Sequence, residues 1–220
     1  ISDCLVGSEM CIRDRDLLRG GWRKEESAAP FVNWNARITA ECYGPNIAAR
    51  LLDEKGNYRD ERNNYSFVSF DCGPTLLRYL ESEEPAVYRG ILDGDRASLA
   101  RFNGHGTALA QSYHHSILPL CNERDTRTEL LWGLADFERR FGRRAEGLWL
   151  PEAAIDTPTL EVLAETDIKF VLLAPQQVSQ VKPSGGDWRV ANACPDLASR
   201  AYDIVLPSGK RLAAFVYDGD

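Results

Sequence analysis

The segment GLWLPE, residues 147–152, places a carboxylic acid directly behind a short apolar run that a proline ends. Because Pro151 stops ladder pairing, Glu152 lies at the carboxyl end of a predicted strand. Barrels and open α/β sheets present reactive side chains at this end of their strands. Glu152 is therefore a candidate nucleophile, and the simpler alternative is a solvated loop residue without chemical function.

Two of the three histidines follow another predicted strand in a similar way. A His-His pair comes after the strand expected over residues 107–112, and its second member, His115, opens the segment HSILPL. A lone histidine is more often structural, but the position and the pairing make His115 a candidate site residue. Asp71, Gln176 and Asp218 also come after predicted strands, and the simpler alternative for the two aspartates is a loop cap.

Aromatic residues and a further histidine complete the set of candidate substrate-binding residues. Trp149 lies three residues before Glu152, and Trp34 belongs to the aromatic-rich stretch 31–43. His105 lies between two glycines ahead of the predicted strand. These rings could line a binding site, although aromatic residues are more often part of the core.

Apolar spacing and cap residues predict the elements that must position these side chains. The segment 46–52 is expected to be a short helix or turn, and 181–199 a surface excursion. Strands are expected over 65–70, 147–150 and 168–173, in addition to 107–112, and a closing hairpin over 202–206 and 211–217. Helices are expected over 74–80, 85–102 and 126–141, with another beginning at Asp156 or Thr157.

Short apolar strands that alternate with helices predict an α/β fold built from parallel β/α units. At 220 residues, the chain is long enough for one sizeable domain. A TIM-like (β/α) barrel is the first choice, and a doubly wound sheet is the alternative. In either architecture the chemistry belongs at the carboxyl ends of the strands.

Composition excludes several classes of partner. A formal charge of −7 argues against a nucleic-acid partner, because binding to phosphates depends on clustered Lys and Arg. No apolar stretch is long enough to span a membrane and no signal peptide is evident, so a cytoplasmic protein without a membrane partner is expected. The six cysteines contain no C-x-x-C pair, so free thiols are the default.

The first fifteen residues, ISDCLVGSEMCIRDR, match no periodic pattern and resemble a translated sequencing-adaptor tail. The motifs of serine hydrolases, P-loop proteins, dinucleotide-binding proteins and zincins are absent from the sequence. A carboxylate nucleophile fits better, because glycosidases need two acids and hydrogen bonds to sugar hydroxyls. The sequence implies neither a metal nor a cofactor, and it leaves the oligomeric state open.

Four segments of the chain resemble glycoside hydrolase family 57. GLWLPE, with two alanines after it, resembles the nucleophile motif of that family, and HSILPL resembles a short motif whose histidine contacts the sugar. SFDCGPTLLRYLE and PFVNWNARITAECYGPN resemble further segments of the family and of related bacterial proteins. The resemblance covers residues 27–220, roughly. It implies an incomplete, seven-stranded (β/α) barrel and a retaining enzyme acting on α-glucans, such as an α-amylase, a 4-α-glucanotransferase or a branching enzyme.

By this resemblance Glu152 is the nucleophile and His115 a substrate-binding residue. The opening His-Gln-Pro motif of the family has no counterpart here. The acid/base aspartate belongs to a downstream motif that YDGD, residues 217–220, does not resemble, so its role is not transferred to Asp218. Residues 16–220 are accordingly expected to be the N-terminal portion of a barrel truncated at both ends, inactive by itself. A catalytically silent carbohydrate-binding barrel and a metal-dependent polysaccharide deacetylase are the alternatives.

Overall fold

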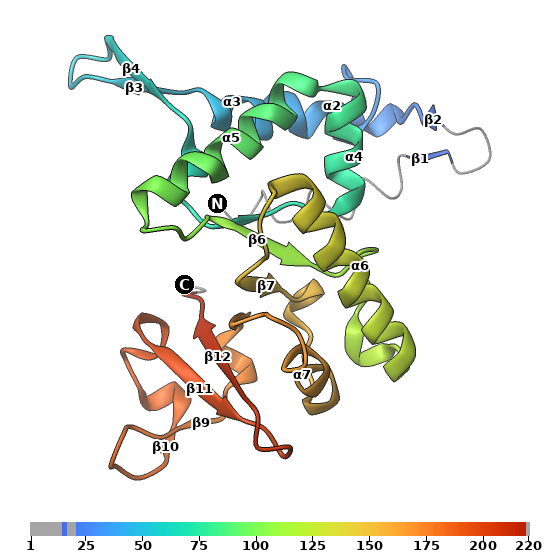
Figure 1. Cartoon of the computed structure of the whole chain (residues 1–220). Helices are drawn as coiled ribbons and strands as arrows, with labels where there is room; N and C mark the ends of the chain where they lie inside the picture. The colour runs from blue at the N-terminus through green and yellow to red at the C-terminus, as the bar shows by residue number, and fades with distance from the viewer. Residues whose placement is uncertain (1–14, 17–20, 219–220) are drawn as a thin grey trace.

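The computed structural model describes residues 15–16 and 21–218 of the chain (Figure 1). The expectation of an adaptor-derived tail over residues 1–15 lies outside this part, apart from Arg15. The chain forms a mixed α/β structure around one six-stranded sheet. The strands of that sheet, in chain order, are β5 (Phe70–Asp71), β6 (Ala108–Gln111), β7 (Gly147–Trp149), β8 (Phe170–Leu173), β11 (Ala201–Val205) and β12 (Arg211–Val216).

The order of the strands decides between the two expected architectures. The sheet runs β11-β12-β8-β7-β6-β5, and every neighbouring pair is parallel except β11 and β12. The parallel strands therefore follow one another in chain order, without the reversal that defines a doubly wound sheet. This arrangement confirms the mostly parallel, partial (β/α) barrel. Antiparallel β11 joins at the edge through the predicted hairpin, whose turn includes Gly209 at φ 81°.

Helices cover one face of this sheet. The helices are α4 (Pro74–Glu83), α5 (Pro85–Arg101), α6 (Glu123–Phe141) and α7 (Thr157–Leu163). Asn122 caps the start of α6 through its side chain, Gly142 ends α6 in the left-handed conformation, and Asp156 caps α7. All four helices were predicted from local signals such as apolar stripes and the prolines that begin α4 and α5, although α6 starts at Glu123, three residues before the expected Thr126. Leu148 and Val171, both fully buried, pack with helix residues such as Leu130 and Leu163.

The opposite side of the sheet, here called the inner face, carries the alternate residues of each strand. Because successive side chains point to opposite sides, the burial of Leu148 and Val171 against the helices assigns Trp149 and Phe170 to the inner face. Close contacts confirm the assignment, since a Cβ added to Gly147 would lie 2.2 Å from the Phe170 ring. Phe170 also meets Phe215 of β12, with ring centroids 5.2 Å apart. The inner face is apolar near the middle of the sheet.

Smaller elements precede and interrupt the sheet. In Figure 1 the hairpin of β3 (Ala49–Leu52) and β4 (Tyr58–Arg62) projects from the rest of the molecule. Its exposed Leu52 and Tyr58 contribute little to a core. The remaining elements are β1 (Arg15–Asp16), β2 (Gly21–Trp22), α2 (Trp34–Ile38), a π-helical turn (Thr39–Tyr43), α3 (Gly44–Ile47), β9 (Gln180–Val181) and β10 (Arg189–Val190). Short 3₁₀ turns occupy Glu26–Ala28, Asn64–Ser66, Leu118–Leu120, Pro151–Ala153, Pro175–Gln177, Ala191–Ala193 and Leu197–Ser199.

Three expectations for the N-terminal half were wrong. Residues 49–52 form a strand, because the turn over 53–57 returns the chain into a hairpin instead of ending a helix. Only Phe70 of the expected strand 65–70 is extended in the sheet, since the side chain of Asn63 accepts a hydrogen bond from the backbone N–H of Tyr65 and starts a turn. Cys42 is disulfide-bonded rather than free, whereas Cys72, Cys121 and Cys194 are free thiols.

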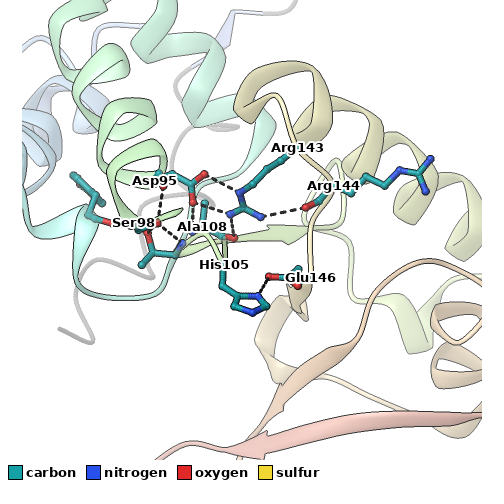
Figure 2. Close-up of polar contacts among 9 residues, drawn as sticks. Asp95, Ser98, His105, Ala108, Arg143, Arg144 and Glu146 are labelled. Atoms are coloured by element: carbon teal, nitrogen blue, oxygen red, sulfur yellow. Dashed lines mark hydrogen bonds and ion pairs between the residues drawn. The ribbon is translucent and has the colours of Figure 1, made fainter. Parts of the chain in front are cut away.

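A buried ion pair joins the layers at the amino end of the sheet (Figure 2). Asp95 of α5 is 2% exposed, and the guanidinium of Arg143 reaches both its carboxylate oxygens, with Nη2–Oδ1 at 2.7 Å and Nε–Oδ2 at 2.9 Å. The N–H of Ala108 donates to Asp95 Oδ1, and Arg143 donates to the carbonyl of Ala108. The pair therefore fastens α5 and the segment after α6 to the first residue of β6.

Candidate functional site

The carboxyl ends of the parallel strands gather the polar and aromatic candidates at one edge of the sheet. Asp71 ends β5, Gln111 ends β6, and Trp149 ends β7 three residues before Glu152. Gln111 is paired directly with Trp149 across the sheet, and both belong to the inner face. We call this the carboxyl edge. It is the position at which the sequence pattern predicted the chemistry.

The turn after β7 holds Glu152 in a left-handed backbone conformation. Glu152 has φ 55° and ψ 20°, and the next residue, Ala153, also has a positive φ of 50°. A non-glycine residue in this region costs about 1–3 kcal/mol unless its surroundings enforce it, and such residues cluster at functional sites. The Pro151 ring, which fixes the preceding φ, and the buried Ala153 side chain hold the turn in place. The Glu152 side chain itself is exposed.

A side chain that follows the neighbouring strand β8 holds this turn in place. Gln177, which follows β8, donates a hydrogen bond from Nε2 to the carbonyl of Ala153. Its Oε1 accepts from the N–H of Ala174, at 2.7 Å, so the amide is held at both ends. The backbone after Glu152 is thereby attached to the end of β8. The orientation of Glu152 depends on two strands rather than one.

His115 is the second candidate in a left-handed conformation, with φ 57°. Burial lowers its pKa from the ordinary value, and the negative charge of Glu152 opposes that shift. The imidazole is therefore neutral at neutral pH and close enough to Glu152 to sense its charge. A neutral imidazole can both donate and accept hydrogen bonds, as recognition of a sugar hydroxyl requires.

The preceding histidine, His114, is bonded to helix α6. His114 Nδ1 lies 2.7 Å from Glu129 Oε1, and its backbone N–H donates to Oε2 of the same carboxylate. The His114 ring also contacts Trp132 of α6. This double attachment to α6 fixes the loop after β6, which also carries His115.

Asp71 and Gln111 meet at the ends of β5 and β6. With its amide oriented by its neighbours, Gln111 donates to Asp71 Oδ2 at 3.1 Å and accepts from the N–H of Gly73 at 2.6 Å. Burial raises the pKa of Asp71 to about 7, and a hydrogen bond from its own backbone opposes the shift. Beyond Gln111, the Trp149 ring meets Tyr217, which follows β12, with centroids 6.2 Å apart. The edge thus combines a polar pair with an aromatic pair.

Of the other two predicted binding residues, His105 lies at the opposite end of the sheet and Trp34 belongs to the N-terminal helical segment. His105 precedes β6, at the amino end of the sheet, where its Nδ1 lies 2.8 Å from Glu146 Oε2 (Figure 2). Trp34 lies at the start of α2, where its Nε1 donates to Ser27 and Arg37 stacks at 5.0 Å from its ring. The structure therefore brings Glu152, His115, Trp149 and Asp71 to one edge and does not bring His105 there.

Sequence reasoning missed three residues of the carboxyl edge. Gln111, Gln177 and Tyr217 act through neighbours on other strands, and no local pattern marks such partners. The one sequence feature that could have identified these residues was their position, since each lies at or just after the end of a predicted strand. Asp218, directly after Tyr217, is exposed beyond the end of β12. The sequence named it as a strand-end residue without assigning it a role.

The described residues contain neither a cluster of metal ligands nor a membrane-spanning helix. No group of three or more His, Cys, Asp or Glu side chains in this part of the chain is arranged to hold a metal ion. Within the same ranges, no helix has both the length and the apolar character needed to cross a bilayer. Chemically, the edge offers an exposed carboxylate, a neutral imidazole, an amide-bound carboxyl group and an aromatic surface.

Comparison with known proteins gives the family. The fold resembles that of an exo-type maltose-forming amylase from Pyrococcus sp. ST04, with a TM-score of 0.59, 19% identity, and coverage of 84% of this chain and 27% of that one. It also resembles a 4-α-glucanotransferase from Thermococcus litoralis, with a TM-score of 0.51, 19% identity, and coverage of 70% and 22%. The chain thus spans about a quarter of the length of these structures.

At such identities the two structures show the fold alone, and no curated protein sequence matches significantly. The family assignment depends instead on a sequence profile that covers most of the chain. The profile described as "Glycosyl hydrolase family 57" matches residues 35–209, which include β5 to β8, the turn of Glu152 and the loop of His115. The expected resemblance is therefore confirmed, and the chain belongs to glycosyl hydrolase family 57.

Proposed function

We propose that the protein is a retaining glycoside hydrolase or glycosyltransfer enzyme acting on α-glucans, with Glu152 as its nucleophile. One observation carries the proposal: Glu152 and His115 both occupy left-handed conformations at the ends of adjacent parallel strands. Backbone strain at two facing loop residues is costly, and it is expected where side-chain orientation matters for function. The family supports the reaction class.

In the proposed reaction, the ionised carboxylate of Glu152 attacks the anomeric carbon of the bound sugar. The glycosidic bond breaks as a covalent glycosyl-enzyme forms, and a carboxylic acid protonates the departing oxygen. Water or an acceptor sugar, deprotonated by the same group, then displaces Glu152. His115, neutral at neutral pH, hydrogen-bonds a hydroxyl of the reacting sugar, and Trp149 packs against the sugar ring.

The second carboxyl group must lie about 5–5.5 Å from Glu152 in a retaining enzyme. The family resemblance assigns it to an aspartate downstream of the residues described here, in which case residues 16–220 are inactive by themselves. Within this chain, a candidate for the same role is Asp218, which follows β12 and stands next to Tyr217, whose ring meets Trp149. Azide rescue distinguishes a downstream aspartate from Asp218 as the acid/base group.

Trapping the covalent intermediate tests the nucleophile. The intact protein is incubated with a 2-deoxy-2-fluoro or 5-fluoro α-glucosyl fluoride, digested, and mapped by mass spectrometry. We expect a single fluoroglucosyl label on the peptide that contains Glu152, and none in Glu152→Gln. A turnover-competent enzyme whose label falls on another residue would contradict the assignment.

Azide rescue identifies the acid/base group. In Asp218→Ala, azide would intercept the glycosyl-enzyme after one inversion and give an α-glucosyl azide, whereas Glu152→Ala with azide would give the β-azide by a single displacement. An α-azide from Asp218→Ala assigns the acid/base role to Asp218. Unchanged turnover in that variant places the role downstream. Binding of maltohexaose without any turnover by the intact protein would favour a silent carbohydrate-binding barrel.

A further inference from the structure

Three aromatic side chains cluster where the loop after β6 meets α6. Tyr113 contacts both His114 and Trp132 at steep angles, with ring centroids 4.8 Å and 5.8 Å apart, and His114 lies 6.2 Å from Trp132. Trp132 is nevertheless 54% exposed, although tryptophan is on average a well-buried residue. Neither neighbouring ring stacks flat against the indole, so its flat apolar surface is accessible to a ligand. We call these three residues the aromatic platform.

Hydrogen bonds hold the aromatic platform in place. The N–H of Tyr113 donates to the carbonyl of Glu129 at 3.1 Å, which bonds the loop directly to the backbone of α6. Gly133 permits this close approach, because a Cβ there would lie 2.1 Å from the carbonyl oxygen of Gln111. The Glu129 carboxylate, on a side chain that is 12% exposed, accepts from the backbone N–H of His114 and lies 2.7 Å from its Nδ1. A surface fixed in this way loses little conformational entropy when a ligand binds.

The His114 ring offers one nitrogen to a ligand. Because a carboxylate can only accept, the Nδ1 next to Glu129 carries a proton. Nε2 is then the second hydrogen-bonding atom of a side chain that is 54% exposed. In the neutral ring Nε2 accepts a hydrogen bond, and in the protonated ring it donates one. A hydroxyl group both donates and accepts, so it can bond Nε2 in either state.

We propose that the aromatic platform binds an α-glucan chain, in addition to the sugar held at the carboxyl edge. A flat apolar ring beside a hydrogen-bonding nitrogen suits a pyranose, whose faces carry C–H groups and whose edges carry hydroxyls. The ligand is uncharged, so the formal charge of −7 does not repel it. Trp132 supplies the stacking surface and His114 the hydrogen bond. The proposal rests on the proposed function for the identity of the sugar.

The position of the platform gives it a role for long substrates. His114 is followed directly by His115, so the platform and the carboxyl edge share one loop. A polymer bound at the platform is therefore kept near the edge, which raises the effective concentration of its other glucose units there. A short oligosaccharide that occupies one site at a time gains nothing from the platform.

Native gels that contain amylopectin test the binding. Each intact protein carries Glu152→Gln to prevent cleavage, and its retardation against a non-binding protein gives the dissociation constant. Trp132→Ala should weaken binding by about 10-fold or more, because truncation of a tryptophan anchor is typically costly. Trp132→Phe keeps a flat ring and should retain most of the affinity. Trp188→Ala makes the same change at a tryptophan that is 64% exposed outside the platform, and it should bind like its parent.

Kinetics of variants that keep Glu152 provide a readout that a merely structural role would not give. Trp132→Ala should raise KM for amylopectin several-fold with kcat unchanged, and should leave both constants for maltohexaose unaltered. Equal losses on the polymer and on maltohexaose would contradict the proposal. Thermal melts confirm that each variant is folded.

The outcomes separate this inference from the proposed function. If amylopectin does not retard the parent protein, or retards folded Trp132→Ala equally, the inference is overturned whether or not Glu152 takes the fluoroglucosyl label. A lower molar mass of Trp132→Ala by light scattering, with unchanged retardation, would assign the tryptophan to an interface between protein chains instead. If retardation depends on Trp132 while Glu152 takes no label, the proposed function fails and the binding site stands.

Discussion

The two ends of the parallel sheet are built on opposite principles. At the amino end, Asp95 is buried and Arg143 partly buried, and the two are bonded to each other and to both backbone groups of Ala108. At the carboxyl end, Glu152 and His115 adopt left-handed conformations, and Asp71 is a carboxyl group whose burial opposes ionisation. One end satisfies its polar groups within the fold, and the other holds them in conformations that the fold must enforce.

The difference teaches how a barrel separates stability from chemistry. Catalysis needs side chains held ready for a substrate, which leaves strain and desolvation in the unliganded protein. The opposite end of the same strands can offset this with closed hydrogen-bond networks. Substitutions at the two ends should therefore have different consequences, with activity lost at one and stability at the other.

The largest effect is expected for Glu152→Gln. Loss of the nucleophile should lower turnover of an α-glucan by about 10⁴-fold or more, with the melting temperature unchanged or slightly raised. Glu146→Gln makes the same chemical change at the amino end and should leave turnover within about twofold. Equal losses in the two variants would remove the distinction between the ends. Steady-state kinetics and thermal melts of purified intact protein provide both readouts.

Arg143→Met should show the reverse pattern. It leaves Asp95 buried without its partner, so the free energy of unfolding should fall by about 3–5 kcal/mol, while turnover per folded molecule is retained. Combining it with Asp95→Leu should recover part of the loss. Arg127→Met, which breaks only exposed pairs, should cost less than about 1 kcal/mol. Urea unfolding measures the free energy of unfolding of each variant. A small effect of Arg143→Met would show that this hydrogen-bond network contributes little to stability.

Gln177→Met weakens the carboxyl edge and leaves the proposed reacting groups unchanged, so it tests whether the turn needs support from β8. The turn of Glu152 loses the hydrogen bond to Ala153, so turnover should fall by about 10- to 100-fold through misorientation. Gln180→Met, an exposed glutamine of β9, is the control. Retention of full activity by Gln177→Met would mean that Pro151 and packing alone hold the turn.

The smallest effect concerns pH and the amino end. The pKa of Glu146 is lowered, first by its hydrogen bond with Lys169 and then by His105. A depressed pKa stabilises the fold above the ordinary value of 4.5, and this contribution disappears as the pH falls through the lower folded value. Glu146→Gln should remove less than about 1 kcal/mol at pH 7 and nothing at pH 3. The same loss at both pH values would contradict the linkage.

The sequence predicted those parts of the fold that depend on local signals. The helices over 74–83, 85–101 and 123–141 have apolar stripes, prolines or caps at their ends, and the positions of Glu152 and His115 followed from strands and a following proline. The segment 65–69 was wrong because the side chain of Asn63 competes with strand pairing. Gln111 and Gln177 escaped prediction because their partners lie on other strands.

The strand order described above also has a kinetic consequence. From β5 to β8, each strand pairs with the one made just before it, so this part of the sheet can assemble through contacts between near neighbours in the chain. β12 is different, since it pairs with β8 only after the excursion that holds β9 to β11. Tyr217 and Asp218 should therefore reach the edge after β5 to β8 have paired, so Trp149 would acquire its aromatic partner later than its strand neighbours.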